Sequence, residues 1–172
     1  MGMDVMGKNP TDDAGEYFRN NVWWWHPLWN YCCEVLPDVC EKVEEGHSNS
    51  GDGLDAEDSI RLADALEEAI RSGHTKEYET AYREHLGSLP REACSLCDET
   101  GIRRDEVGIQ YGYHDKKLTP EQASLYGREF GWCNGCDGHG SQANFMSNYP
   151  FDVSNVDEFA QFLRHCGGFQ IF

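Results

Sequence analysis

The chain has 172 residues, of which 39% are hydrophobic and 12% aromatic, and its formal net charge is −17. It is long enough to bury a core, too apolar for a disordered tail, and without an apolar run that would span a membrane. The first ten residues, MGMDVMGKNP, lack the basic and apolar regions of a signal peptide. We therefore expect a cytoplasmic, mainly α protein that forms one compact domain.

Residues 1–90 are expected to form a helical body that begins with an unusually aromatic segment. Pro27 lies within this segment, and proline suits the first turn of a helix better than its interior. We therefore expect one helix to end near the run of tryptophans and another to begin there. Pro37 is expected to begin a further short helix. The segment contains seven aromatic residues: Tyr17, Phe18, Trp23, Trp24, Trp25, Trp29 and Tyr31.

Two longer helices are predicted in the second half of this body. Asp55 is placed to cap the first, which has apolar residues at helical spacing and Gly73 at its end. Thr75 is placed to cap the second helix. We expect the two helices to pack as an antiparallel pair.

Residues 91–142 carry two cysteine pairs and are expected to form an insertion in the helical body. The insertion has room for a short hairpin around GIQYGYH and for a short helix opened by Thr119 and Pro120. Residues 143–172 are expected to pack back on the body through a helix capped by Ser154. The chain ends in FQIF, and an end this apolar is expected to dock on the core.

The cysteine pairs are Cys94 with Cys97 and Cys133 with Cys136, each spaced CxxC, with 35 residues between the pairs. Four thiolates in two such turns match a tetrahedral zinc site, and the glycines after each pair suit tight backbone turns. Four thiolates leave no position for water or substrate, so we expect one structural Zn²⁺ without a catalytic role. The alternative is two unrelated pairs of buried or redox-active cysteines.

The segment CNGCDGHG matches the CxxCxGxG repeat in the cysteine-rich region of DnaJ-type chaperones. The segment CSLCDETG matches it too, except that Glu99 replaces the first glycine. The resemblance implies that both segments share one zinc ion held by the four cysteines. The chain lacks the His-Pro-Asp motif of a J-domain, so chaperone function is not implied. His114 and His139 are further candidates for contact with the metal.

The other four cysteines are interpreted as small buried hydrophobic residues. On a single helix, Cys33 and Cys40 would lie about 10 Å apart along the axis, beyond the reach of a disulfide. A disulfide between the adjacent Cys32 and Cys33 would be strained. Cys166 is assigned to the core.

Acidic residues are concentrated between residues 34 and 68, where twelve carboxylates and only two cations contribute −10 to the net charge. This charge disfavours direct nucleic-acid binding and favours a protein partner with a basic surface. The alternative is a solvated face that only keeps the chain soluble. Tryptophans are favoured at interface centres, although most of those in the aromatic segment are expected in the core. The candidate partner-binding residues are Glu41, Glu44, Glu45, Asp55, Glu57, Asp58, Trp23 and Trp24.

The N-terminal pattern MGMDVxGxNP followed by GEYFRNNVWWWxPLW resembles a group of short uncharacterised proteins from bacteria, phages and other mobile elements. The resemblance covers about the first 29 residues and implies an accessory protein of phage or mobile-element origin in a bacterial host. We therefore expect a non-enzymatic, zinc-stabilised interaction protein. Its expected role is to inhibit a host nucleic-acid-binding or defence complex, as anti-CRISPR and DNA-mimic proteins do.

Two other functions stay open at this point. The chain contains no nucleotide-binding, hydrolase or metalloprotease motif, but catalytic residues need not be neighbours in sequence, so an enzyme with an unrecognised site is one alternative. The other is a zinc-ribbon nucleic-acid binder. Four cations near the cysteine pairs offer it a small basic patch: Arg103, Arg104, Lys116 and Lys117.

Overall fold

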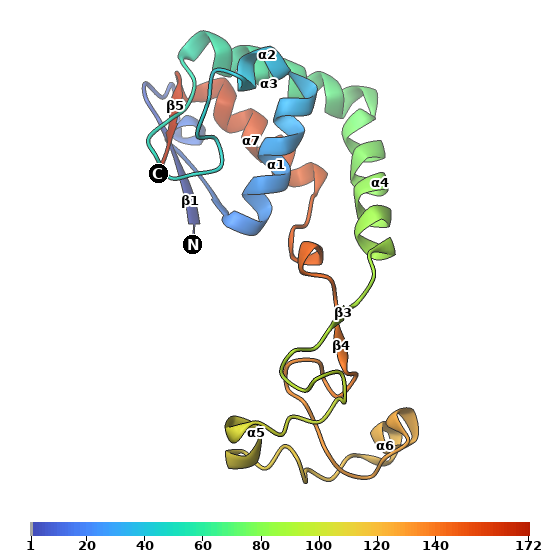
Figure 1. Cartoon of the computed structure of the whole chain (residues 1–172). Coiled ribbons are helices and arrows are strands. Elements are labelled where there is room, and N and C mark those ends of the chain that lie inside the picture. Colours follow the sequence, from blue (N-terminus) through green and yellow to red (C-terminus); the bar gives the residue numbers. More distant parts are fainter. Residues whose placement is uncertain (1) are drawn as a thin grey trace. The chain divides into compact units, whose positions relative to one another are not determined.

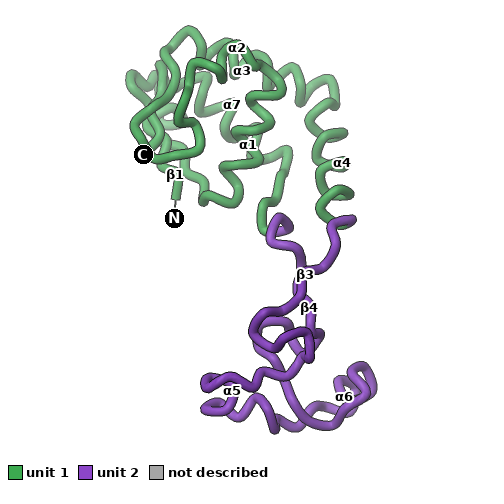
Figure 2. Tube along the Cα trace, viewed as in Figure 1, with its two compact units in different colours: residues 1–87, 148–172 green, residues 88–147 purple. Residues whose placement is uncertain are grey.

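The structure is a computed structural model that describes residues 2–172. The chain divides into two compact units (Figure 2). Unit 1 comprises the residues up to Gly87 together with Asn148–Phe172, and unit 2 comprises Ser88–Ser147. The sequence predicted one domain with an insertion at 91–142, and the ends of unit 2 lie a few residues outside those bounds. Helices predominate and strands are short, so the expected mainly α class with small β parts is confirmed.

Unit 1 contains a three-stranded antiparallel sheet that the sequence patterns did not reveal (Figure 1). Its strands, in the order in which they pair, are β2 (Tyr17–Asn21), β1 (Gly2–Gly7) and β5 (Phe169–Ile171). Val5 lies opposite both Phe18 and Ile171. Met3 and Val5 are buried, which is the alternation of a strand with one face on a core. Because β5 carries the apolar end of the chain, the expected docking of FQIF is confirmed.

Helix α1 (Val22–Val35) continues through Pro27, so the predicted break is wrong. The Asn21 side chain accepts hydrogen bonds from the Trp23 and Trp24 amides at 3.0 and 3.2 Å and thereby starts the helix. A proline at this depth removes one backbone hydrogen bond. Pro27 is buried, and the packing of this face outweighs that loss.

Leu36 ends α1 with φ −141° and ψ 74°, and α2 (Pro37–Cys40) follows directly. Cys33 therefore lies in the last turn of α1, and Cys40 ends α2. The separation expected for a single helix does not apply to these two thiols, because α1 ends between them. Cys32, Cys40 and Cys166 are buried as expected.

Three longer helices complete unit 1: α3 (Ala56–Ser72), α4 (His74–Ser88) and α7 (Val153–His165). The predicted ends of α3 are confirmed. Asp55 accepts a hydrogen bond from the Asp58 amide at 2.9 Å, and Gly73 ends the helix with φ 89°.

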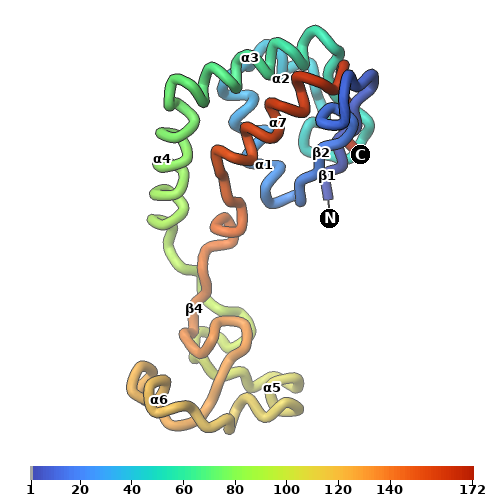
Figure 3. The backbone as a smooth tube through the Cα atoms, turned by 180° about the vertical axis from the view of Figure 1, so that it is seen from behind, coloured from blue at the N-terminus to red at the C-terminus, as the bar shows by residue number. Residues whose placement is uncertain are grey.

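The predicted antiparallel pair of α3 and α4 is wrong. Helix α3 packs along α7, and α4 turns away from α3 at Gly73 (Figure 3). Two predicted caps are also wrong. Thr75 is buried within α4, which starts one residue earlier, and Asp152 rather than Ser154 caps α7.

Unit 2 is built from short elements: β3 (Glu92–Ala93), α5 (Glu106–Gln110), α6 (Pro120–Tyr126), β4 (Ser141–Gln142) and the 3-10 turn η2 (Phe145–Asn148), which ends at the unit boundary. β3 pairs with β4. The hairpin expected around GIQYGYH is instead α5, because Asp105 caps this segment by accepting from the Gly108 amide at 2.7 Å. The predicted capping box of Thr119 and Gln122 at the start of α6 is confirmed.

Within residues 2–172, no helix combines the length and the apolar character needed to cross a membrane.

Candidate metal centre

Two turns of unit 2 bring four cysteines together. We call residues 94–101 the first knuckle and residues 133–140 the second knuckle. The four Sγ atoms lie within 4.8 Å of one another, and all four cysteines are buried. Between the knuckles, the Sγ atoms are 3.8 Å apart for Cys94 and Cys133 and 3.7 Å apart for Cys97 and Cys136. A tetrahedral zinc ion with bonds of about 2.3 Å places its sulfur ligands about 3.8 Å apart. The four predicted ligands therefore form one cluster whose spacing fits such an ion.

The two knuckles have matching backbone conformations. Gly101 N–H donates to Cys97 Sγ at 3.3 Å, and Gly140 N–H donates to Cys136 Sγ at 3.2 Å. Amides directed at sulfur favour the thiolate that a metal requires. Each knuckle thus supplies one such bond at the same position.

Glu99 occupies the position that Gly138 has in the second knuckle. Both residues are left-handed, with φ 62° for Glu99 and φ 80° for Gly138. This conformation costs a residue with a Cβ about 1–2 kcal/mol. A Cβ on Gly138 would lie 3.2 Å from the rings of Trp132 and Tyr126. The first knuckle therefore keeps the repeat's fold without its glycine, at the cost of local strain.

Glycines also let the knuckles pack against each other. A Cβ on Gly101 would lie 2.2 Å from the Gly138 carbonyl oxygen, and a Cβ on Gly140 would lie 2.1 Å from the Glu99 carbonyl oxygen. The Cys94 amide donates to the Gly140 carbonyl oxygen at 3.0 Å. A larger residue at Gly101 or Gly140 would push the knuckles apart.

Arg128 joins the two knuckles from the segment between them. Its Nη2 donates to the carbonyl oxygens of Gly101 at 3.1 Å and Gly138 at 2.8 Å. Its guanidinium carbon lies 4.8 Å from the centre of the Tyr126 ring, and its Nε is buried without a partner. Four thiolates around a divalent ion leave an excess of negative charge, which a neighbouring guanidinium offsets. Sequence reasoning missed Arg128 because it belongs to neither CxxC motif, and its contacts with both knuckles depend on how the segment between them folds.

The thiols differ in acidity. Burial raises the pKa of Cys97 to about 12 and also raises the pKa of Cys136. Burial acts in the same direction on Cys94, but the neighbouring Leu96 amide and the other thiols outweigh it and lower its pKa. A bound cation is therefore required to hold all four sulfurs as thiolates, and its binding releases protons.

Neither histidine considered as a metal contact joins the cluster. His139 is exposed, with its Nε2 3.3 Å from the Tyr126 hydroxyl. His114 is also exposed and lies beside Asp115, with 3.8 Å between Nε2 and Oδ2. In the part of the chain that the structure describes, the cluster consists of the four cysteines.

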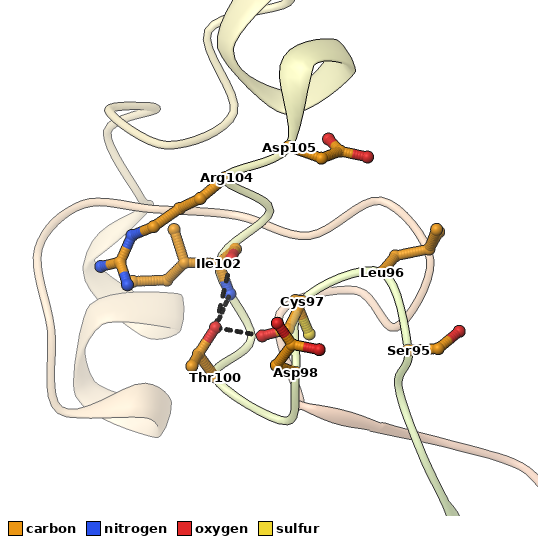
Figure 4. A pocket seen from close by; sticks show the side chains of 8 residues that line it. All are labelled: Ser95, Leu96, Cys97, Asp98, Thr100, Ile102, Arg104 and Asp105. Carbon is orange, nitrogen blue, oxygen red and sulfur yellow. Dashed lines mark hydrogen bonds between the residues drawn. The ribbon is translucent and has the colours of Figure 1, made fainter.

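A hollow of about 390 Å³ lies beside the first knuckle (Figure 4). Several of its polar groups support the local backbone. The Thr100 hydroxyl donates to the Cys97 carbonyl oxygen at 2.5 Å, and the Asp105 carboxylate caps α5. Its lining contains no histidine. The lining residues are Ser95, Leu96, Cys97, Asp98, Thr100, Ile102, Arg104 and Asp105.

An open hollow of about 480 Å³ in unit 1 brings a histidine and two carboxylates to one place. These are His74, Glu34 and Glu68. His74 Nδ1 lies 3.0 Å from the Tyr31 hydroxyl. An enzyme whose site is not visible in the sequence would depend on a grouping of this kind.

Five of the six predicted acidic contact residues are exposed, whereas Asp58 is only 5% exposed. The Asp58 carboxylate lies 2.5 Å from Lys42 Nζ and 2.8 Å from Arg61 Nη1. Asp58 is therefore left out of the proposed contact residues, because it is buried and paired with two cations inside unit 1. The exposed residues are Glu41, Glu44, Glu45, Asp55 and Glu57.

The tryptophans divide as expected between core and surface. Trp25 and Trp29 are buried, and their rings stack with centroids 5.7 Å apart. Trp23 and Trp24 are half-buried. The Trp23 ring lies 4.9 Å from the Tyr149 ring, so part of this pair packs within unit 1 and part reaches the surface.

The predicted basic patch is smaller than the sequence suggested. The Arg103 guanidinium donates to Asp105 at 2.8 Å and to Asn134 at 2.9 Å, and its side chain is only 12% exposed. Lys116 Nζ lies 4.7 Å from the Trp132 ring centre. These contacts occupy two of the four cations on which a zinc-ribbon nucleic-acid binder would depend.

No protein-family model, curated protein or solved structure matches this chain.

Proposed function

We propose that this chain is a non-enzymatic, zinc-stabilised protein that binds a partner with a basic surface through unit 1. The supporting observation is how the charges of residues 34–68 are paired. Lys42 and Arg61, the two cations of this stretch, are both used internally. Lys42 pairs with Asp58, and Arg61 pairs with Asp38 and Asp58.

The carboxylates left over form what we call the acidic face: Glu41, Glu44, Glu45, Asp55 and Glu57. Among the described residues, none of the five forms an ion pair. Exposed carboxylates without counter-charges raise the local concentration of a basic partner and speed its association at low salt. The field of this face repels nucleic acid and favours a protein that normally binds nucleic acid.

A single structural zinc ion is the cofactor we propose for unit 2. An all-thiolate set suits zinc and is unsuited to magnesium or calcium, which prefer oxygen ligands. The closed set of four cysteines leaves no position for a reacting group. Apart from these cysteines, Leu118 is the buried hydrophobic residue of unit 2, so the metal takes the place of a hydrophobic core.

The target we propose is a nucleic-acid-binding or defence protein of a bacterial host, with the chain encoded by a phage or another mobile element. The resemblance of the N-terminal 29 residues supports the origin. The acidic face supports the class of target, since it can compete with nucleic acid for a basic groove as anti-CRISPR and DNA-mimic inhibitors do.

The test is capture from a bacterial lysate on the immobilised, metal-loaded chain. A variant that combines Glu41→Lys, Glu44→Lys and Glu57→Lys reverses the acidic face. The matched control combines Glu77→Lys, Glu84→Lys and Glu158→Lys, which make the same charge change at exposed sites on α4 and α7.

We expect a protein that wild type and control retain at low salt, that duplex DNA displaces, and that the acidic-face variant fails to retain. Equal retention by all three chains would contradict a role for the acidic face. Retention that duplex DNA does not displace would contradict the proposed class of target.

A second candidate function is an enzyme that uses the hollow lined by Glu34, Glu68 and His74. The variant His74→Ala distinguishes the two candidate functions, because it should affect turnover by the enzyme and leave partner capture by the acidic face unchanged. Loss of a measured turnover with unchanged partner capture would favour the enzyme, and unchanged turnover would exclude this hollow as its site.

A further inference from the structure

The sheet of unit 1 has one covered edge and one open edge. Its strands pair in the order β2, β1, β5, so β2 and β5 are the edge strands. The loop before α3 covers β5: Gly51 N–H donates to the Ile171 carbonyl oxygen at 2.8 Å, and Ile171 N–H donates to the Asp52 carbonyl oxygen at 2.8 Å. Among the described residues, β2 pairs with β1 alone. The outer side of β2 is therefore an open edge.

The register of the sheet determines which backbone groups lie on this open edge. Asp4 exchanges both of its backbone hydrogen bonds with Phe172, directly after β5, at 2.8 and 2.7 Å. Arg19, the partner of Asp4 on β2, therefore directs its N–H and C=O away from β1. Tyr17 does the same, because backbone groups alternate between the two sides of a strand. No described residue outside the sheet forms a hydrogen bond to the backbone of Tyr17 or Arg19.

The side chains around the open edge favour a basic partner. The Arg19 guanidinium lies 3.5 Å from the Asp4 carboxylate, so the cation of β2 is already paired. Asp13 and Glu16 are exposed directly before the strand, and within the described part of the chain neither forms an ion pair. The Tyr17 ring is 46% exposed and can lie against a cation. Free backbone groups thus lie beside carboxylates without counter-charges.

We propose that the outer edge of β2 binds an extended segment of a partner protein with basic side chains at alternate positions. The added strand exchanges backbone hydrogen bonds with Tyr17 and Arg19, which supply affinity, and its alternate side chains supply specificity. A second copy of the chain would bring a further charge of −17 to the edge, which disfavours self-pairing. The edge shares no residue with the acidic face, so this proposal does not rest on the function proposed above.

The experiment measures hydrogen exchange at single amides of the full, metal-loaded chain with capped peptides as probes. The first peptide alternates lysine and valine. The second has glutamate in place of lysine, and the third keeps the first sequence with a methyl group on every backbone nitrogen. With the lysine peptide at about ten times its Kd, exchange at the Tyr17 and Arg19 amides is expected to slow about tenfold. We expect the other two peptides to leave both rates unchanged.

Two variants of one residue separate strand pairing from charge. Arg19→Pro removes the N–H that faces the added strand, a change that the outer side of an edge strand tolerates. It is expected to weaken binding of the lysine peptide about fivefold, as for the loss of one net hydrogen bond. The matched control Arg19→Thr loses the same charge, keeps the N–H, and is expected to bind at least as tightly as wild type. The exchange rates of the wild-type chain decide the proposal even if a variant fails to fold.

Four outcomes would overturn the proposal. Exchange at Tyr17 and Arg19 that no concentration of the lysine peptide slows would remove the site. Equal slowing by the glutamate peptide would contradict a basic partner, and equal slowing by the methylated peptide would contradict strand pairing. Slowing that grows with chain concentration without peptide would assign the edge to a second copy. None of these outcomes bears on capture through the acidic face, so the two proposals can fail separately.

Discussion

Gly140 donates its N–H to Cys136 Sγ at 3.2 Å in the second knuckle, and Gly101 donates to Cys97 Sγ at the equivalent position of the first knuckle. One local turn thus occurs twice around a single cluster of sulfurs. Because each turn supplies two cysteines and one N–H···S bond, neither knuckle is complete without the other. This dependence underlies the first three predictions.

Removing the metal is expected to unfold unit 2 and leave unit 1 folded. Binding of structural zinc by small domains is worth about 10–16 kcal/mol in apparent free energy, and unit 2 has little other core. Metal analysis should return one zinc per chain. Hydrogen exchange should show loss of protection at the Gly101 and Gly140 amides after chelation or in Cys136→Ser, with the Trp25 region protected as before. Unchanged protection of both glycines in chelator would contradict the metal assignment.

Glu99→Gly is expected to stabilise unit 2, and Gly138→Ala to destabilise it. The first change relieves a left-handed residue with φ 62°, a gain of about 1 kcal/mol. The second adds a Cβ 3.2 Å from the Trp132 ring at a position with φ 80°. Both effects are measured by denaturant unfolding, with hydrogen exchange of the unit 2 amides as the readout. Stability changes of the same sign in the two variants would argue against equivalent knuckles.

Arg128→Gln is expected to weaken the junction of the two knuckles and speed metal release. The substitution removes donors from the carbonyl oxygens of Gly101 and Gly138, and an unpaired buried group costs about 1–3 kcal/mol. Arg104→Gln is the matched control, because it removes an exposed arginine of the same unit. Release of zinc to a chromogenic chelator gives the rates. Equal rates for the two variants would contradict the bridging role of Arg128.

Asp58→Asn is expected to lower the stability of unit 1 at pH 7 by about 1–3 kcal/mol. The hydrogen bond from Lys42, and then that from Arg61, hold the pKa of Asp58 below its ordinary value. The stabilisation is therefore complete above the unfolded pKa of about 3.9 and is lost as the pH falls through the lower folded pKa. Urea unfolding at pH 7 and pH 3 should show a smaller pH difference for Asp58→Asn than for wild type. The exposed Asp157→Asn should behave like wild type.

The stacked rings of His26 and His47, with centroids 4.6 Å apart, predict a second pH dependence in unit 1. Burial lowers the pKa of His26, and burial together with the His26 charge lowers the pKa of His47. Because the unfolded chain binds these protons more readily, stability is complete above about pH 6.5 and falls as the pH drops below it. His47→Gln should reduce the change of the unfolding midpoint with pH between about pH 5 and 7. A profile as steep as that of wild type would contradict this assignment.

Local signals allowed the metal cluster and several helix ends to be predicted. The CxxC spacing places two sulfurs on one turn wherever that turn lies, and the side chains of Asp55 and Thr119 cap helices through amides three residues away. Such contacts depend on few neighbours in sequence. Pro27 shows the limit of a local rule, because tertiary packing kept the helix intact around it.

Several features that the sequence did not determine depend on contacts between residues that are separated along the chain. β1 pairs with β5 across most of the sequence, and Arg128 reaches Gly101 and Gly138 in separate knuckles. In the sequence, nothing distinguishes Asp58 from the exposed carboxylates around it. Only folding brings Lys42 beside it. The sequence by itself determined which residues carry sulfur and charge. Tertiary structure alone decided which of those charges are paired and buried, because burial and pairing are properties of the neighbours that folding supplies.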